Sequence, residues 1–510
     1  MAYSATQILV AGGAVWFVYQ WYLFRVTKKK VDSIPTFGGD GFISSYLSGW
    51  KFLFQGHRII NEGSKKYPGR AFKVPTITTP NRWLIIVSGP ELAGDVRRAG
   101  ENQLNFNDYA FEGLQSKYTF GDCNTCAEEP YHVKTAREFI RAFPSRFGGV
   151  NEEVMECVAA YLPKDSEWTG CPLEKILTPM VARASNRLLV GLPLCQNEDY
   201  CALLAGLTTR TFIVANILNM LPESLKPLVG MLLSRFPADV KKLNAYLGPL
   251  FEERRRLDKA YGSNKWEGRP NDFISALLDT VPEKFNDTKD LALRVINLNI
   301  AAIHTTVITL SFILLELAAR QEYIAPIREE IESVAQEYGW TKESMSRMVK
   351  LDSFMKEVAR LCVASALVSG RKARTDYQLS DGTVIPKGFS MATAGATFHL
   401  DPEAYEHPDE FDGFRFCKDL QDSDGANLGN LRNQMVALDP NFLLFGQGRP
   451  ACPGRFFAVN EIKLIVAHIL VNYDIKLPND STSAPPPIWF AALRAPSPNA
   501  AVLFRKRQTE

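Results

Sequence analysis

The stretch between Asp290 and Arg320 constrains the fold of this chain most strongly. It contains no glycine or proline, and Val295–Leu315 within it carries no charged side chain. A continuous helix over this stretch would be about 45 Å long. Its central polar residues are Asn297, Asn299, His304, Thr305, Thr306, Thr309 and Ser311. Such polar density is costly in lipid, and a helix that is apolar nearly all round belongs in a large core. We therefore predict a central buried helix whose polar groups face an internal site.

The N-terminus has a second uncharged stretch, which differs because basic residues follow it directly. Met1–Phe24 has no charged side chain, and Arg25 and Lys28–Lys30 come next. As a helix, Ala5–Phe24 would span the roughly 30 Å hydrocarbon core of a bilayer. A cleavable leader, which is the alternative, would place its positive charge before the apolar stretch. We predict a transmembrane signal anchor in residues 1–30, spanning about residues 5–24, with the body (residues 31–510) in the cytosol.

The composition is that of a globular protein. The chain has 510 residues, a formal net charge of +2 and nine cysteines, so it indicates neither a nucleic-acid partner nor a disulfide framework. Apolar residues recur every three or four positions in Val150–Leu162, Leu173–Val190, Leu243–Tyr261, Ile324–Glu337 and Leu351–Cys362. Strand patterns are few: Trp83–Val87, Ser380–Ile385 and Ala501–Phe504. These patterns predict a mainly α body with a small amount of sheet.

The most informative short segment is Phe442–Phe457, which is rich in glycine and contains Cys452. Gly446–Ala451 matches the loose dinucleotide-binding fingerprint, but Pro450 and Cys452 fit poorly inside a pyrophosphate turn. A plain glycine-rich turn into a helix is a second interpretation. In a third interpretation, tight folding around the sulfur lets backbone N–H groups and the start of the following helix favour a thiolate. A thiolate in a dry pocket suits an axial ligand of haem.

The spacing Phe445-x-x-Gly448-x-x-x-Cys452-x-Gly454 resembles the signature of the cytochrome P450 family. The resemblance extends over nearly the whole chain after the anchor and is closest to fungal, basidiomycete microsomal members. It implies a helix-rich body around a long central helix, a small β-rich subdomain and one haem domain over residues 31–510. It also implies haem b, with Cys452 as the axial ligand and Phe445 and Gly446 beside it.

Three further residues resemble a structural network of the family. Glu357 and Arg360 form its ExxR pattern, and their spacing places both side chains on one face of a helix. Arg415 lies between this pattern and Cys452, where the family has a second arginine. The resemblance implies a buried Glu357–Arg360–Arg415 network that supports the proximal side without a role in the chemistry.

On the central helix, Ala301–Thr306 aligns with a segment of the family that contains an acid followed by a threonine. Thr305 is the implied catalytic hydroxyl, which would bond the bound oxygen and a water and pass protons. His304 replaces the usual acid. It either relays protons, because its ordinary pKa is near neutrality, or only forms a hydrogen bond to the helix.

The propionates of haem need positive partners. Arg371 lies five residues before Asp376, a spacing that resembles the family's propionate-binding arginine. His132 and Arg137 stand near the place of a Trp-x-x-x-Arg pair, although the tryptophan is absent. Pro450 occupies a position that is often Arg or His, and Arg449 is its neighbour. These four basic residues are the candidate propionate ligands.

The resemblance implies a membrane-bound monooxygenase of the endoplasmic reticulum. Its electrons would come from NADPH through a separate NADPH–cytochrome P450 reductase, with cytochrome b5 as a second candidate donor. Arg449, Arg455 and Lys463 would form the docking face, or else an ordinary solvated face. The substrate would be lipophilic, because the body is tethered at the bilayer, and a terpenoid or sterol-like molecule of fungal secondary metabolism is favoured. The alternatives are a haem-thiolate isomerase or dehydratase that does not use dioxygen, and a non-catalytic haem sensor.

Overall fold

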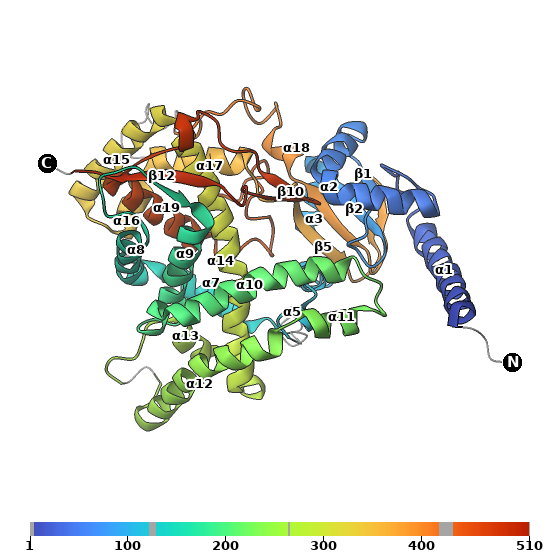
Figure 1. The fold of residues 1–510 in the computed structure, drawn as a ribbon, viewed down its shortest axis with the longest axis horizontal. Helices are drawn as coiled ribbons and strands as arrows, with labels where there is room; N and C mark the ends of the chain where they lie inside the picture. The colour runs from blue at the N-terminus through green and yellow to red at the C-terminus, as the bar shows by residue number, and fades with distance from the viewer. Residues whose placement is uncertain (1–4, 122–128, 264–265, 418–431, 509–510) are drawn as a thin grey trace.

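The long helix α14 (Thr288–Ala319) runs through the middle of the computed structural model (Figure 1). The structure describes residues 5–121, 129–263, 266–417 and 432–508. Asp287 caps α14 by accepting hydrogen bonds from the N–H groups of Lys289 (3.0 Å) and Asp290 (3.2 Å). Most of α14 is buried, in contact with α9 (Leu173–Leu189), α10 (Glu198–Asn219) and α12 (Phe236–Tyr261). The predicted central buried helix is confirmed.

Helices make up most of the remaining body, as the apolar spacing predicts. The other predicted helices are α8 (Phe147–Tyr161), α15 (Ile324–Tyr338) and α17 (Val349–Leu361). Shorter helices are α3 (Pro90–Arg98), α4 (Phe106–Gly113), α5 (Ser116–Thr119), α7 (Tyr131–Arg141), α11 (Lys226–Leu233), α13 (Phe273–Thr280), α16 (Lys342–Arg347) and α18 (Ala396–His399). Helix α19 (Arg455–Asn472) begins three residues after Cys452 and is almost wholly buried. The expected mainly α fold is confirmed.

The sheets are small and lie at the edges of the helical body. The largest has the order β1 (Ala71–Pro75), β2 (Trp83–Val87), β8 (Ser390–Ala394), β5 (Leu367–Ala373) and β3 (Leu104–Asn105). Only the β2–β8 pair in it is parallel. A second sheet joins β4 (Thr169–Pro172), β12 (Ala501–Lys506) and β9 (Tyr473–Lys476). Two hairpins pair β6 (Tyr377–Gln378) with β7 (Val384–Ile385) and β10 (Ile488–Phe490) with β11 (Leu493–Ala495). All three predicted strand regions contain strands.

At the N-terminus, α1 (Ala5–Lys30) projects from the body at the end of the molecule opposite to the C-terminus (Figure 1). The base of α1 packs against the first sheet, where the ring of Phe24 lies 6.1 Å from that of Trp83. The buried Lys73 donates from Nζ to the carbonyl oxygens of Val31 (2.8 Å) and Ile34 (2.5 Å). The segment after α1 is therefore fixed against β1. Helix α2 (Phe42–Lys66) follows it.

Two helices within the described chain are long and apolar enough to cross a membrane. They are α10 and α14, whose most apolar windows are 44% and 61% buried in the body. Core helices meet the same criteria, so this is weak evidence for a span. Helix α1 does not meet these criteria. The predicted transmembrane anchor is therefore not confirmed here.

Candidate functional site

Cys452 lies on a tight loop directly before α19. Its N–H donates to the carbonyl oxygen of Phe445 at 2.9 Å, which closes the loop. Gly446 and Gly448 have positive φ angles of 69° and 73°, a conformation that other residues rarely adopt. A Cβ atom on Gly448 would also lie 2.7 Å from the carbonyl oxygen of Arg97. The glycines therefore let the loop turn back and pack closely against α3.

The sulfur of Cys452 is in a dry environment with donors aimed at it. Burial raises the pKa of the Cys452 thiol. The backbone N–H groups of Gly454 and Arg455 and the charge of Arg455 act in the opposite direction, as the sequence predicts. A sulfur with N–H donors and a guanidinium beside it suits a metal ligand, because metal ligation requires the deprotonated sulfur.

Arg371 on β5 is a buried cation whose hydrogen-bond partners are neutral. Its side chain donates to the carbonyl oxygens of Gly370 (2.7 Å) and Gln447 (3.5 Å), and the latter contact joins it to the cysteine loop. Within the described ranges, Arg371 forms no ion pair with a carboxylate. Burial lowers its pKa to about 10. Because a buried charge is costly unless it is paired, Arg371 is suited to bind an anionic group.

Ser369, two residues before Arg371, is a candidate site residue that the sequence analysis does not single out. Its φ angle is +52°, at an irregularity in the pairing of β5 with β8. Its hydroxyl is buried and has no hydrogen-bond partner in the described part of the chain. The Ser369 Oγ atom lies 4.0 Å from where a Cβ atom added to Gly446 would stand. Strain and an unsatisfied hydroxyl in one residue indicate a functional position.

His132 and Arg137, both on α7, have different environments. The Nη1 group of Arg294 lies 3.0 Å from Nδ1 of His132, and burial together with this charge lowers the pKa of His132 to about 3. A guanidinium can only donate, so Nδ1 accepts and Nε2 carries the proton. Arg137 is exposed and close enough to Arg455 to lower its pKa. Arg449 is also exposed. The charge of Arg137 thus acts on Arg455 beside the loop, whereas His132 is held by Arg294 on α14.

Thr305 and Ala301 are exposed although they lie in the middle of the buried helix α14. They therefore border open space inside the fold. The Thr305 hydroxyl donates to the carbonyl oxygen of Ala301 at 2.7 Å. This bond occupies its proton and leaves the oxygen lone pairs as acceptors.

His304 points toward α10. Its Nε2 lies 3.2 Å from the Thr209 hydroxyl, and its ring makes an edge contact with Phe212. Burial lowers its pKa, although Glu174 acts in the opposite direction. The observed contact is a hydrogen bond to a neighbouring helix, so the proton-relay role remains a prediction.

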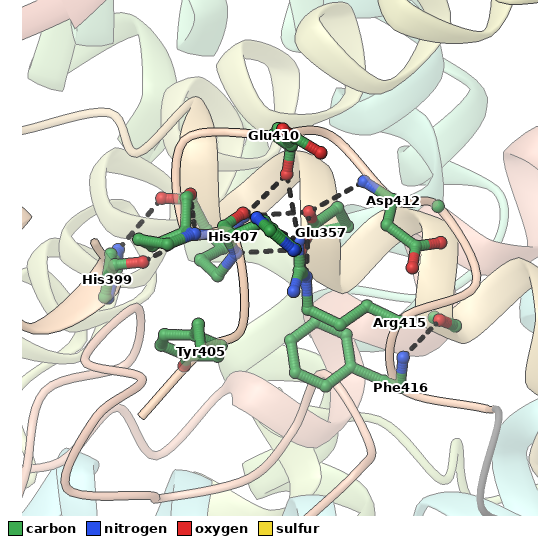
Figure 2. Close-up of polar contacts among 12 residues, drawn as sticks. Glu357, His399, Tyr405, His407, Glu410, Asp412, Arg415 and Phe416 are labelled. Atoms are coloured by element: carbon green, nitrogen blue, oxygen red, sulfur yellow. Dashed lines mark hydrogen bonds and ion pairs between the residues drawn. The ribbon is translucent and has the colours of Figure 1, made fainter. Parts of the chain in front are cut away.

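Glu357, Arg360 and Arg415 form one network around the buried Glu357 carboxylate. Figure 2 shows Glu357 and Arg415 in this network. Arg360 donates to both carboxylate oxygens of Glu357 at 2.8 Å, and Arg415 Nε lies 3.2 and 3.3 Å from them. The N–H of Asp412 adds a further bond at 3.0 Å. The remaining donors of the two arginines bind the carbonyl oxygens of His399, Glu406, His407, Pro408 and Glu410. The network joins α17 to the segment that leads toward the cysteine loop.

Lys463 is not on an exposed docking face, which corrects the sequence-based prediction. Its side chain is buried, pairs with Asp352 at 2.6 Å and donates to the carbonyl oxygen of Met345 at 2.9 Å. Arg455 is partly buried and donates to the carbonyl oxygen of Cys452 at 3.1 Å. The sequence could not show this, because Lys463 lies on a helix that is apolar nearly all round and its partner is on α17.

The fold and loop described here define a helical scaffold that can hold a metal cofactor through one sulfur. The family described as Cytochrome P450 matches residues 46–504. Cytochrome P450 monooxygenase 151 of Postia placenta is 37% identical over 490 residues, covering 95% of this chain and 96% of that protein. Cytochrome P450 monooxygenase CYP512U6 of Ganoderma lucidum is 30% identical, covering 95% and 94%. The chain belongs to the cytochrome P450 monooxygenase family.

A solved structure shows the same fold at low sequence identity. The cytochrome P450DA heme domain has a TM-score of 0.69 and 19% identity, covering 93% of this chain and 98% of that chain. Membership of the family implies haem with cysteine thiolate ligation. The residues present fit this group, because N–H donors and Arg455 face the Cys452 sulfur, the buried Arg371 forms no ion pair with a carboxylate in the described chain, and the buried Ser369 hydroxyl has no partner there.

Proposed function

We propose that this protein is a membrane-anchored haem-thiolate monooxygenase that oxidises a lipophilic substrate with electrons from NADPH through a separate reductase. Residues 31–510 form its haem domain. The observation that carries the proposal is the juxtaposition of the Cys452 loop and Arg371, which meet through Gln447. The Cys452 loop would supply the sulfur for the iron, and Arg371 would supply a buried positive charge for a propionate.

Haem held by the Cys452 thiolate would supply the activation of dioxygen. Arg371 would hold a propionate, and the Ser369 hydroxyl, which has no partner in the described chain, would donate to an anionic group there. His132 offers its Nε2 proton to an anion, and Arg137 and Arg449 are the remaining candidates. Cys452 is kept in place by its bond to Phe445.

Thr305 is the hydroxyl that would take part in proton transfer. Its lone pairs face the open space beside Ala301, where they can accept a hydrogen bond from a water molecule. When the bond to the Ala301 carbonyl breaks, the same hydroxyl can donate a proton. Thr305 would thus hold a water and pass a proton from it during the reaction. His304 lies one position before Thr305, and a relay of protons by its imidazole is part of the proposal.

Exposed apolar residues support attachment to a membrane. Helix α1 exposes Val15, Trp16, Phe17, Val18, Tyr19, Trp21 and Tyr22. Helix α2 exposes Ile43, Leu47, Trp50 and Phe54, whose spacing places them on one face of the helix. Helix α11 adds Leu228, Met231, Leu232 and Leu233. We propose that α1 anchors the body to the cytosolic side of the endoplasmic reticulum.

The partners and substrate class follow from this placement. A reductase in the same membrane, with cytochrome b5 as a second donor, would approach the exposed Arg137 and Arg449 near the cysteine loop. The substrate is lipophilic, and we propose a terpenoid or sterol-like molecule of fungal secondary metabolism. The relatives come from Postia placenta and Ganoderma lucidum, which supports the fungal setting. The half-exposed Phe106 and Leu493 offer apolar surface to such a substrate.

The deciding experiment is the carbon monoxide difference spectrum of the reduced full-length protein in membranes. Wild type should give the strongly red-shifted Soret band of thiolate ligation, and Cys452→Ser should lose it. Purified reductase should then support NADPH-dependent oxidation by the wild type. Haem without the shifted band in a folded protein would refute thiolate ligation. Normal ligation without NADPH-dependent turnover would refute the monooxygenase.

A further inference from the structure

His399, the last residue of α18, lies between the Glu357 network and the cysteine loop. It is 1% exposed. Its Nδ1 lies 3.2 Å from the carbonyl oxygen of Arg360, and its Nε2 lies 2.9 Å from the N–H nitrogen of Leu443. Figure 2 shows His399 beside the network. Its two ring nitrogens therefore contact two segments that are far apart in the sequence.

The partners of His399 determine its tautomer. The carbonyl oxygen of Arg360 can only accept a hydrogen bond, so Nδ1 of His399 must be protonated and donate to it. The backbone N–H of Leu443 can only donate, so Nε2 must be unprotonated. Burial lowers the pKa of His399 to about 4, so the ring stays neutral under ordinary conditions. A single protonation state of the ring therefore satisfies both bonds.

The Leu443 end of this link leads directly to Cys452. The carbonyl oxygen of Leu443 accepts from the N–H of Gly446 at 3.0 Å, and that of Phe445 accepts from the N–H of Cys452 at 2.9 Å. Leu443 is fully buried, so no bulk water can replace its lost partner. A buried N–H group without a partner is unfavourable, and the chain would move to satisfy it.

The bond of His399 to Arg360 is also held in place by further contacts. Arg360 donates from Nη1 to the carbonyl oxygen of His399 at 2.7 Å, so the two residues bond each other in both directions. Arg360 is in turn held by Glu357. The ring of His399 also stacks on that of Phe442, with centroids 5.5 Å apart. Position and orientation of the ring are thus both determined.

We propose that His399 is a positioning residue that transmits the rigidity of the Glu357–Arg360 pair to the Cys452 loop through Nε2 and the Leu443 N–H. The inference rests on the proposed haem-thiolate function. It assigns the imidazole no contact with haem or substrate. Without the Nε2 acceptor, the loop start shifts, and a smaller share of the bound haem has the thiolate as its ligand.

Two variants separate the two bonds of the ring. His399→Gln places an amide oxygen near the Nε2 position and keeps an acceptor for Leu443. His399→Asn places an amide nitrogen near Nδ1 and keeps the donor to Arg360, but loses that acceptor. Phe442→Leu is the control for stacking, because it removes the ring contact and leaves both hydrogen bonds. Each is made in the full-length chain and purified with bound haem.

The measurement is the fraction of total haem that gives the thiolate-type carbon monoxide band, with far-UV circular dichroism to check the fold. We expect His399→Gln and Phe442→Leu to keep the wild-type fraction and His399→Asn to lower it about fivefold or more. A wild-type fraction in folded His399→Asn, or an equal loss in His399→Gln, would overturn the proposal. If His399→Asn does not fold, the proposal is judged on His399→Gln alone, and a loss of the thiolate-type fraction in that variant overturns it. Absence of the band in the wild type would instead refute the proposed function.

Discussion

The Glu357 carboxylate allows a sharp test of how the core is held together. Glu357→Gln conserves size but removes the charge that two guanidinium groups share. The carboxylate is fully buried and receives bonds from Arg360 at 2.8 Å, from Arg415 at 3.2 and 3.3 Å, and from the Asp412 N–H at 3.0 Å. In the variant, one oxygen becomes an N–H donor that faces a guanidinium, and the buried Arg360 charge is unpaired. Breaking a buried pair in this way costs about 3–5 kcal/mol.

A matched control is Glu129→Gln, which breaks an ion pair in solvent. Glu129 lies 2.8 Å from Lys284, and the two side chains are 49% and 63% exposed. Exposed pairs contribute about 0–1 kcal/mol. The assay is the free energy of unfolding in urea of the detergent-solubilised, haem-loaded protein, followed by circular dichroism. If the two variants lose the same free energy, within about 1 kcal/mol, the buried network does not carry the charge pairing inferred for it.

Three further outcomes are expected. Arg371→Met removes the proposed propionate partner, so haem should dissociate about tenfold faster or more when transferred to excess apomyoglobin; an unchanged rate would place the propionates elsewhere. Thr305→Ala should leave the carbon monoxide spectrum intact while product formation falls about 10²-fold; equal turnover would remove Thr305 from proton transfer. Burial raises the pKa of Glu461 to about 8, so the folded protein retains a proton that the unfolded chain releases at lower pH. Wild-type stability should therefore fall by up to about 1.4 kcal/mol per unit between about pH 5 and pH 8, and Glu461→Gln should abolish that slope in urea titrations; a slope shared by both proteins would contradict the assignment.

Local patterns predicted the elements well. The central helix was expected over Asp290–Arg320 and is observed as Thr288–Ala319, where Asp287 provides the cap. The strand Trp83–Val87 has the predicted bounds. Helix periodicity and a run of β-branched residues are properties of neighbouring residues, so they can be read without knowledge of the packing.

Side-chain partners from distant segments could not be predicted in the same way. Lys463 was placed on a docking face but is paired with Asp352, and the contact of His304 with Thr209 joins residues 95 positions apart. Ser369 has no distinctive sequence signal, because its strain and unsatisfied hydroxyl arise only when β5 meets the cysteine loop. Each of these contacts depends on how two separate elements pack together.

By itself, the sequence determined the class of protein, because the glycines and Cys452 lie within a few residues and set the geometry of one loop. It also determined the helical body, through periodicity that any packing must respect. Only the tertiary structure decided which charges are buried and paired, and how His399 joins Arg360 to Leu443. The physical reason is that hydrogen bonding and desolvation depend on atoms within a few ångströms, and these atoms come from segments whose order in the chain does not reveal their distance in space.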